Sequence, residues 1–324
     1  MRWFSLYLAF AFCPTLTSAV ELYQLHDDKS IWRYTGSPCS GNSCSGWRLL
    51  DNNPRTKAIA AGGTKLYQLR DDGSIWRYTG TPCGGGSCPG WQMLDNNGQT
   101  KAIVAAGKAL YQLHSTGAIW SFTGDPCSGS SCPGWQLLDN NPQTTSITAG
   151  GWALYQLHGT GAIWHFTGTP CSSGSSCPGW KLLDNNPQTK AIAAGGAALY
   201  QLHGTGAIWL HAGLPCSGDA CWKRLDNNPQ TKAIAAGGTA LYQLHGTGAI
   251  WRHAGLPCSG DACWQKLDQN AQTEAIAAGG GELYQLHNSG LVWRFNGTPC
   301  SGNSCPGWQR LDNNAQTESI TAGQ

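Results

Sequence analysis

The chain has 324 residues, with 20 basic and 18 acidic side chains and a formal net charge of +2. This near-neutral balance does not favour nucleic acid or an anionic membrane surface as a partner. Only 12% of the residues are charged, whereas 44 are Gly and 16 are Trp. That composition favours an all-β protein of many short strands and tight turns over one with long amphipathic helices.

The first nineteen residues have the order of a secretory signal peptide. Arg2 precedes an apolar run from Trp3 to Phe12, and small residues occupy positions 17–19. A membrane anchor is the alternative, but the run is shorter than the ~20 apolar residues that span a bilayer. We therefore predict that residues 1–19 are removed, that one domain covers residues 20–324, and that the protein is secreted and extracellular without membrane insertion.

A segment that begins with Leu-Tyr recurs along the rest of the chain. Its seven copies start at Leu22, Leu66, Leu110, Leu154, Leu199, Leu241 and Leu283. Repeats of 42 to 45 residues indicate a solenoid or a propeller. Leucine-rich or ankyrin repeats would need one or two helices in each unit, for which the Gly and Trp content leaves no room.

Each unit contains four short runs with strand character. In the fifth unit these runs are residues 191–195, 198–203, 207–211 and 222–226, which are separated by Gly-Gly, by Gly-Thr-Gly and by a Cys-bounded loop. Such connections are typical of hairpins. Four antiparallel strands for each blade and seven blades predict a seven-bladed β-propeller. The strand order places the Gly-Gly turns and Cys-bounded loops on one side of the disc, and the other connections on the opposite side.

The phase of the repeat predicts how the ring closes. The mature chain starts with a second strand, at 20–26, and ends with a seventh copy of the first strand, Ser319 to Gly323. We expect this C-terminal strand to join the N-terminal blade, because the mixed blade removes an open sheet edge.

The cysteines fall into seven close pairs once Cys13 leaves with the leader. The pairs are Cys39 with Cys44, Cys83 with Cys88, Cys127 with Cys132, Cys171 with Cys177, Cys216 with Cys221, Cys258 with Cys263, and Cys300 with Cys305. An even count, regular pairing and a secretory leader predict seven local disulfides. A zinc site would need two such pairs, or one pair with two His, to converge on one ion. We expect no metal and no cofactor.

The same Gln stands in the second strand of every unit: Gln24, Gln68, Gln112, Gln156, Gln201, Gln243 and Gln285. A buried amide must be paired, so a hydrogen bond between blades is the favoured interpretation, with sugar contact as the alternative.

The pattern IAAG, LYQLHGTGAIWRYTG and GWQLLDNN resembles the repeat of the tectonin and tachylectin group of β-propeller lectins. The resemblance covers all seven units. It implies a propeller fold, glycan binding, and a role in defence or recognition. The Cys pair in every unit departs from the ordinary tectonin pattern, and units five and six lack the Pro-Gly before Trp222 and Trp264.

We expect no enzyme, because catalysis needs one asymmetric constellation and nearly every polar residue here belongs to a sevenfold set. The repeated acids are Asp51, Asp95, Asp139, Asp184, Asp226, Asp268 and Asp312. They stand in LDNNP-like segments, where Asp and Asn commonly cap turns. Clustered Asp and Asn leave calcium as an alternative, but their spacing does not match an EF-hand loop.

Repetition without an asymmetric site favours multivalent binding, which gains avidity through effective concentration. An aromatic ring can cover the apolar face of a pyranose while polar groups bond its hydroxyls. One candidate set follows each Cys-bounded loop and is expected to be accessible: Trp47, Trp91, Trp135, Trp180, Trp222, Trp264 and Trp308. For this set, ligand contact and packing between blades are both open.

A second aromatic set lies in the third strand, where packing is the expected role: Trp32, Trp76, Trp120, Trp164, Trp209, Trp251 and Trp293. The residue after each of these varies, and Arg33, Arg77, Arg252 and Arg294 are candidate sugar contacts at that place. The alternative is a solvated strand position.

Two further residues stand outside the repeat pattern. Trp152 falls at a Gly-Gly turn, where we expect an exposed aromatic on the disulfide side. Asn296, in Asn-Gly-Thr, is the sole glycosylation sequon and predicts a surface position.

Together these observations predict a secreted, multivalent lectin that binds glycans of glycoproteins or glycolipids. The alternatives are a non-catalytic scaffold that binds proteins through one propeller face and, less favoured, a hydrolase.

Overall fold

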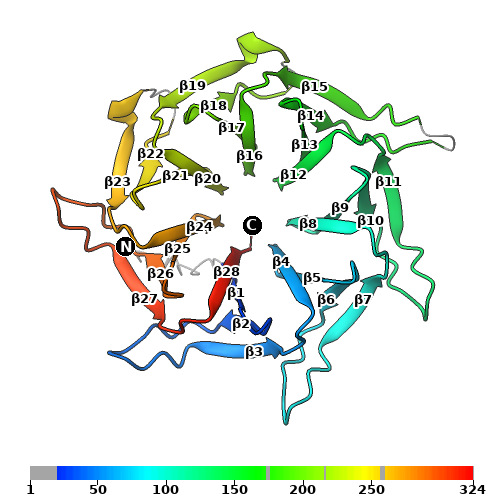
Figure 1. Cartoon of the computed structure of the whole chain (residues 1–324), viewed down its shortest axis with the longest axis horizontal. Helices are drawn as coiled ribbons and strands as arrows, with labels where there is room; N and C mark the ends of the chain where they lie inside the picture. The colour runs from blue at the N-terminus through cyan, green and yellow to red at the C-terminus, as the bar shows by residue number, and fades with distance from the viewer. Residues whose placement is uncertain (1–19, 173–175, 215–216, 256–259, 324) are drawn as a thin grey trace, which may run out of the picture.

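The computed structural model describes residues 20–172, 176–214, 217–255 and 260–323. The predicted leader, residues 1–19, lies outside the described residues, as do Cys216 and Cys258. Figure 1 shows seven four-stranded sheets arranged radially around a central axis. Each sheet is a blade, numbered here 1 to 7 in chain order, so the predicted all-β propeller is confirmed.

Each blade runs from the axis to the rim through four antiparallel strands. The innermost strands of blades 1 to 7 are β28 (Thr317–Ala322), β4 (Thr56–Gly62), β8 (Thr100–Ala106), β12 (Thr144–Gly150), β16 (Thr189–Gly195), β20 (Thr231–Gly237) and β24 (Thr273–Gly279). The second strands are β1 (Leu22–His26), β5 (Lys65–Arg70), β9 (Ala109–His114), β13 (Ala153–His158), β17 (Ala198–His203), β21 (Ala240–His245) and β25 (Glu282–His287).

The two outer strands complete each blade. The third strands are β2 (Ile31–Tyr34), β6 (Ile75–Tyr78), β10 (Ile119–Phe122), β14 (Ala162–Phe166), β18 (Ala207–His211), β22 (Ile250–His253) and β26 (Val292–Phe295). The fourth strands are β3 (Trp47–Asp51), β7 (Trp91–Asp95), β11 (Trp135–Asp139), β15 (Trp180–Asn185), β19 (Trp222–Asn227), β23 (Trp264–Asp268) and β27 (Trp308–Asp312). Two short 3-10 helices, η1 (Asp219–Cys221) and η2 (Asp261–Cys263), precede the fourth strands of blades 5 and 6.

The ring closes as the sequence predicts. Strand β28 pairs antiparallel with β1, with Ala322 opposite Leu22 and Ser319 opposite Leu25. The C-terminal strand is therefore the innermost strand of the blade that the N-terminal strands begin, and the last described residues lie beside the central axis (Figure 1). Closure leaves neither end of the ring with an exposed sheet face.

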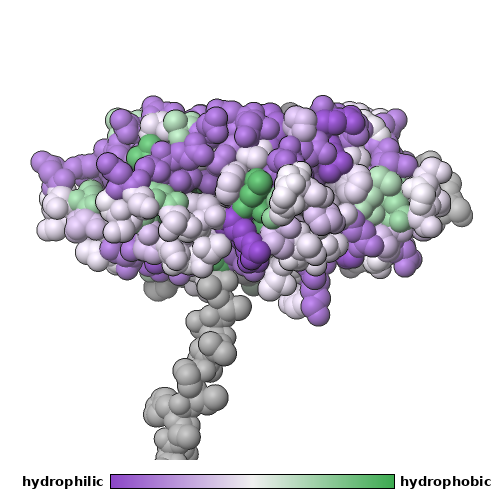
Figure 2. Space-filling view, turned by 90° about the horizontal axis from the view of Figure 1, so that it is seen from below, coloured by the Kyte–Doolittle hydropathy of each residue, from purple (hydrophilic) through white to green (hydrophobic). Residues whose placement is uncertain are grey.

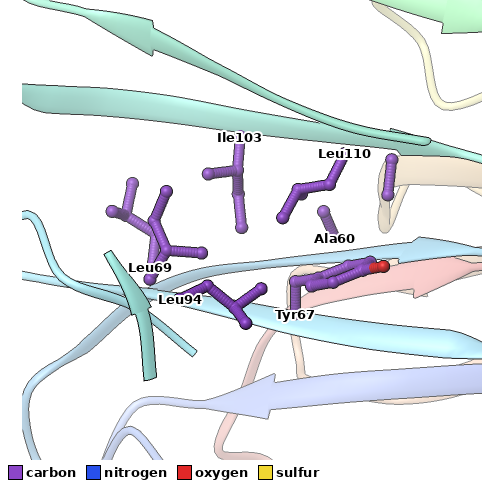
Figure 3. Close-up of a cluster of buried hydrophobic side chains, with 8 residues drawn as sticks. Ala60, Tyr67, Leu69, Leu94, Ile103 and Leu110 are labelled. Carbon is purple, nitrogen blue, oxygen red and sulfur yellow. The ribbon is translucent and has the colours of Figure 1, made fainter. Parts of the chain in front are cut away.

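The core lies between blades, because both faces of each sheet are covered by neighbours. Figure 3 shows one such layer, in which Tyr67, Leu69 and Leu94 of blade 2 meet Ile103 and Leu110 of blade 3. Alternation along the second strand produces this arrangement. Tyr23 and Leu25 of β1 pack toward blade 2, whereas Gln24 on the other face reaches blade 7.

Small residues are required where the innermost strands converge. A Cβ added to Gly62 would lie 2.8 Å from the backbone nitrogen of Ala106, and one added to Gly150 would lie 2.7 Å from the carbonyl carbon of Ala194. The strands surround a central channel of about 320 Å³ lined by Ile, Val, Ala and Thr side chains. Figure 2 shows the disc edge-on, with a mostly hydrophilic surface and scattered hydrophobic side chains.

Candidate functional site

Clefts open between neighbouring blades on the side of the disc that carries the Gly-Gly turns. Four of them are well formed: cleft 7/1 of about 300 Å³, cleft 1/2 of about 340 Å³, cleft 4/5 of about 710 Å³ and cleft 5/6 of about 520 Å³, each named for the two blades that form it. The same repeat positions line each of them, so the repeat builds four related concave sites.

Cleft 1/2 illustrates the shared construction. One wall is Tyr23 of β1 and Arg33 of β2, which are cross-strand partners and therefore project from the same face of blade 1. The other wall is Tyr78 and Thr79 of blade 2, and Lys65 stands at the Gly-Gly turn. Arg33, the residue after the third-strand Trp of blade 1, thus lies in a cleft.

Cleft 4/5 is the largest of the four and has an aromatic rim. Trp152 is 96% exposed and Leu214 is 45% exposed. Inside, the rings of Tyr155 and His165 lie 5.2 Å apart, centroid to centroid. His211 completes the wall from blade 5.

Cleft 4/5 is also uncharged near neutral pH. Among the described residues that line it, none is Asp, Glu, Lys or Arg. Burial lowers the pKa of His165, and the nearby His211 and Lys181 lower it further. The backbone N–H of Gly213 donates to Nδ1 of His211 at 3.2 Å, which identifies that nitrogen as unprotonated. The cleft therefore offers aromatic faces and neutral hydrogen-bonding groups.

Cleft 5/6 has a mixed character. Tyr200 and Leu210 form its blade 5 wall, and Arg252 and His253 line it from blade 6. Burial lowers the pKa of His253, with a smaller contribution from Lys223. Of these four side chains, Arg252 is therefore the one that is charged at neutral pH.

Cleft 7/1 carries ionic side chains of both signs. Cleft 7/1 is lined by Arg33 and Arg294 together with Glu21 and Glu282. Burial raises the pKa of Tyr284 strongly, and Glu282 raises it further, so its hydroxyl stays protonated and can donate a hydrogen bond.

The four candidate arginines all line these clefts. Arg33 lies in clefts 7/1 and 1/2, Arg77 in cleft 1/2, Arg252 in cleft 5/6 and Arg294 in cleft 7/1. Guanidinium Nη2 of Arg77 donates to Oε1 of Gln92 at 2.6 Å, and Nη2 of Arg294 donates to Oε1 of Gln309 at 3.0 Å. The structure thus brings this set to the mouths of concave sites.

The Trp that begins each fourth strand lies between blades. Its indole N–H donates to a backbone carbonyl in the fourth strand of the preceding blade, as Trp91 does to Leu50 at 2.9 Å. The others are Trp47, Trp135, Trp180, Trp222, Trp264 and Trp308, at 2.8 to 3.4 Å. Trp222 and Trp264 are only 8% exposed and the rest are partly buried, so these indoles are less accessible than their position after a loop suggests.

The third-strand Trp packs inside its own blade. In six blades it lies against the His that ends the second strand, with centroids 5.7 to 5.9 Å apart, as for His158 and Trp164. In blade 2 the guanidinium of Arg70 takes the place of the His, 4.1 Å from the Trp76 ring centroid. The expected packing role is confirmed.

The repeated Gln forms a hydrogen bond between blades, as predicted. Gln156 Nε2 donates to Oδ2 of Asp139 in the preceding blade at 2.8 Å, and its Oε1 accepts from Thr144 of its own innermost strand. The other oxygen of the repeated Asp accepts from the next backbone N–H, as Asp139 does from Asn140 at 2.9 Å. The repeated Gln, Thr and Asp side chains therefore join neighbouring blades, and none of them lines one of the four clefts.

The disulfides stand on the same side as the clefts. Five of the predicted pairs are present: Cys39–Cys44, Cys83–Cys88, Cys127–Cys132, Cys171–Cys177 and Cys300–Cys305. Cys221 and Cys263 are also bonded, and their predicted partners lie outside the described residues. Asn296 of the sequon is exposed, directly after β26. Across the described part of the chain, no three His, Cys, Asp or Glu side chains gather as a metal site.

Sequence reasoning missed part of each cleft wall. The second-strand Tyr, the acids Glu21 and Glu282, and Lys65 line clefts without having been singled out. A signal was present for the Tyr, since it recurs in all seven units on the face opposite the Gln. The acids directly precede the repeated Leu in units one and seven and the Lys does so in unit two, and only the packing of two blades assigns them to a site.

Comparisons with known proteins support the fold. The structure is similar to yeast RCC1 (Prp20) bound to Kap60, at 12% identity and a TM-score of 0.59 over 91% of this chain and 84% of that one. It is similar to human WBSCR16 at 12% identity and 0.55, over 85% and 88%. It is also similar to YCF48 bound to a D1 peptide at 14% identity and 0.50, over 79% and 83%. No protein-family model and no curated protein matches the sequence.

Proposed function

We propose that the protein is a secreted, multivalent carbohydrate-binding protein whose inter-blade clefts bind glycans of glycoproteins or glycolipids in cell-surface recognition or defence. The observation that carries this proposal is cleft 4/5. Trp152 is 96% exposed on its rim, and the cleft behind it combines aromatic rings with neutral polar groups. An indole that contacts almost nothing in its own protein is suited to stack on the apolar face of a pyranose.

The repetition supports multivalent binding. Related clefts on one rigid disc hold several glycans in a fixed arrangement, and avidity then exceeds the affinity of one site by ~10² or more. The disulfides support an extracellular location, since such bonds persist in oxidising compartments. The resemblance of the repeat to tectonin and tachylectin lectins agrees with both points.

A glycan array with competition by free sugar tests this function, using the wild type, Trp152→Ala and Trp152→Phe. We expect Trp152→Ala to bind neutral glycans about tenfold more weakly, because one stacked ring contributes roughly 1.4 kcal/mol. Trp152→Phe should retain part of the affinity. Both variants should keep the wild-type melting temperature, since the side chain is exposed. Wild-type protein without any sugar signal would refute the proposal.

A protein-binding scaffold is the second candidate. RCC1 and YCF48 are similar in fold, and their structures contain Kap60 and a D1 peptide respectively. This candidate predicts saturable capture of a defined protein that persists after enzymatic removal of its glycans. Binding that free sugar abolishes would contradict it.

A further inference from the structure

Blade 1 places two arginines opposite each other on its face toward blade 2. Arg33 of β2 and Arg48 of β3 are cross-strand partners, next to Tyr23 in the same row. Like charges directly opposite in a sheet repel and are destabilising. The Arg33–Arg48 pair therefore costs stability unless a negative charge lies between the two guanidinium groups.

In blades 2 and 7, the position equivalent to Arg48 holds a Gln, so no second positive charge faces the Arg. Arg77 faces Gln92 in blade 2, and Arg294 faces Gln309 in blade 7; in both, the amide oxygen accepts a hydrogen bond from the guanidinium. In blade 1 a second guanidinium takes the place of that amide.

The two arginines also lack strong partners. Within the described part of the chain, Arg48 makes no hydrogen bond or ion pair. Arg33 has only Glu21, with Nη1 and Oε1 3.9 Å apart, which is too far for a hydrogen bond. Most of the guanidinium donors of this pair are therefore available to a ligand.

Cleft 1/2, beside this pair, has a cationic surplus. Arg33, Lys65 and Arg77 line it, against one acid, Glu21. One carboxylate oxygen of Glu21 already accepts the hydroxyl hydrogen of Tyr23.

Arg48 adds to this field from the strand edge. Burial raises the pKa of Tyr78, which lines the cleft, and the charges of Arg33 and Arg48 oppose that rise. Arg33 thus lines the cleft, and Arg48 is exposed beside it, with a charge that reaches Tyr78 of the cleft lining.

The neighbouring clefts differ in charge. In cleft 7/1, Arg33 and Arg294 are balanced by Glu21 and Glu282, and the described lining of cleft 4/5 carries no charged side chain. The four clefts are therefore not chemically uniform, and cleft 1/2 has the largest cationic surplus, with three cations against one acid, compared with the single Arg252 of cleft 5/6.

We propose that cleft 1/2 binds the anionic group, a carboxylate or a sulfate, of an acidic glycan, with Arg33 and Arg48 as its principal donors. An anion between the two guanidinium groups accepts charge-assisted hydrogen bonds and removes their repulsion. This inference rests on the proposed function and adds a second ligand class to it: neutral pyranoses in cleft 4/5 and acidic ones in cleft 1/2.

The test uses matched sugar triplets on one array. Glucose, galactose and N-acetylglucosamine are each displayed as the neutral sugar, its 6-sulfate and its 6-carboxylate. We expect at least one anionic member to exceed its neutral parent, and the two anionic arms show which group is preferred. Salt should weaken the anionic signals, because solvent-accessible charges are screened within ~8 Å at physiological ionic strength.

The decisive variant is Arg48→Gln, which gives blade 1 the Arg–Gln pair of blades 2 and 7. We expect it to lower binding of the anionic sugars about tenfold or more, the loss of one charge-assisted hydrogen bond, while neutral binding is unchanged. Its melting temperature should equal or exceed that of the wild type, because the repulsion is gone. Trp152→Ala is the matched control and should show the reverse selectivity.

The outcomes separate this inference from the proposed function. Neutral binding without any anionic preference overturns the inference alone, as does Arg48→Gln with full anionic binding. The absence of both signals overturns the inference and the lectin proposal together. Anionic binding that disappears in Arg48→Gln and survives in Trp152→Ala supports separate sites for acidic sugars in cleft 1/2 and neutral sugars in cleft 4/5.

Discussion

Removing the last six residues, 319–324, takes away most of β28 and opens the ring. The deletion removes four residues paired with β1, from Ser319 opposite Leu25 to Ala322 opposite Leu22. It also removes the partly buried Ile320 and the buried Ala322 from the cluster that contains Leu22. Strand β1 then becomes an exposed edge beside the channel.

The size of the effect follows from these contacts. The lost ladder contributes about 3 kcal/mol at ~1 kcal/mol for each backbone hydrogen bond, and the lost apolar burial contributes about 2 kcal/mol. A loss of roughly 5 kcal/mol, with an unfolding entropy of about 2 cal/mol/K per residue, lowers the melting temperature of a chain of this size by roughly 8 °C.

Differential scanning calorimetry measures this shift. Deleting only residues 323–324 is the control, since it removes the hydrogen bond from the Gly323 N–H to the carbonyl of Glu21 and leaves β28 in place. We expect that control to lose less than about 2 °C. Equal melting temperatures for the six-residue deletion and the wild type would refute closure by β28 as a source of stability.

Three further predictions concern the blades. Burial lowers the pKa of the second-strand histidines (His26, His114, His158, His203, His245 and His287), so the unfolded chain binds protons first on acidification. Stability should be fully present above the unfolded pKa of about 6.5 and fall below it, and equal melting temperatures at pH 7.5 and 5.5 would contradict this. Gly161→Ala should cost more than ~1 kcal/mol in urea unfolding, because φ is +88° and the new Cβ would lie 2.1 Å from the Asn186 carbonyl oxygen, whereas Gly159→Ala should cost less. Intact mass should rise by fourteen hydrogens on full reduction of the mature chain, and a smaller gain would show that a predicted disulfide is missing.

The blade and its closure were predictable because their signals are local. Strand runs, Gly turns and Cys pairs repeat within about 44 residues, and the phase of residues 319–323 indicates the missing strand directly. The repeated Gln was predictable for a different reason: a buried amide requires a partner, and Asp139 supplies it for Gln156.

The clefts could not be predicted from one repeat, because each is formed by two blades. The sequence does not show that Arg33 and Thr79, one unit apart, face the same cavity. It also left open the role of the fourth-strand Trp, since a position after a loop is compatible with exposure. In the structure that indole points between two blades, where the N–H of Trp91 donates to the backbone carbonyl of Leu50. Blade rotation therefore decides which aromatic is accessible, and Trp152 is accessible because it lies on a turn.

The most direct test of glycan binding is a crystal structure of the protein soaked with its strongest neutral array ligand. We expect a pyranose in cleft 4/5, with its apolar face on the indole of Trp152 and its hydroxyls toward His165 and Tyr155. A sugar bound only outside the inter-blade clefts would contradict glycan binding in these clefts.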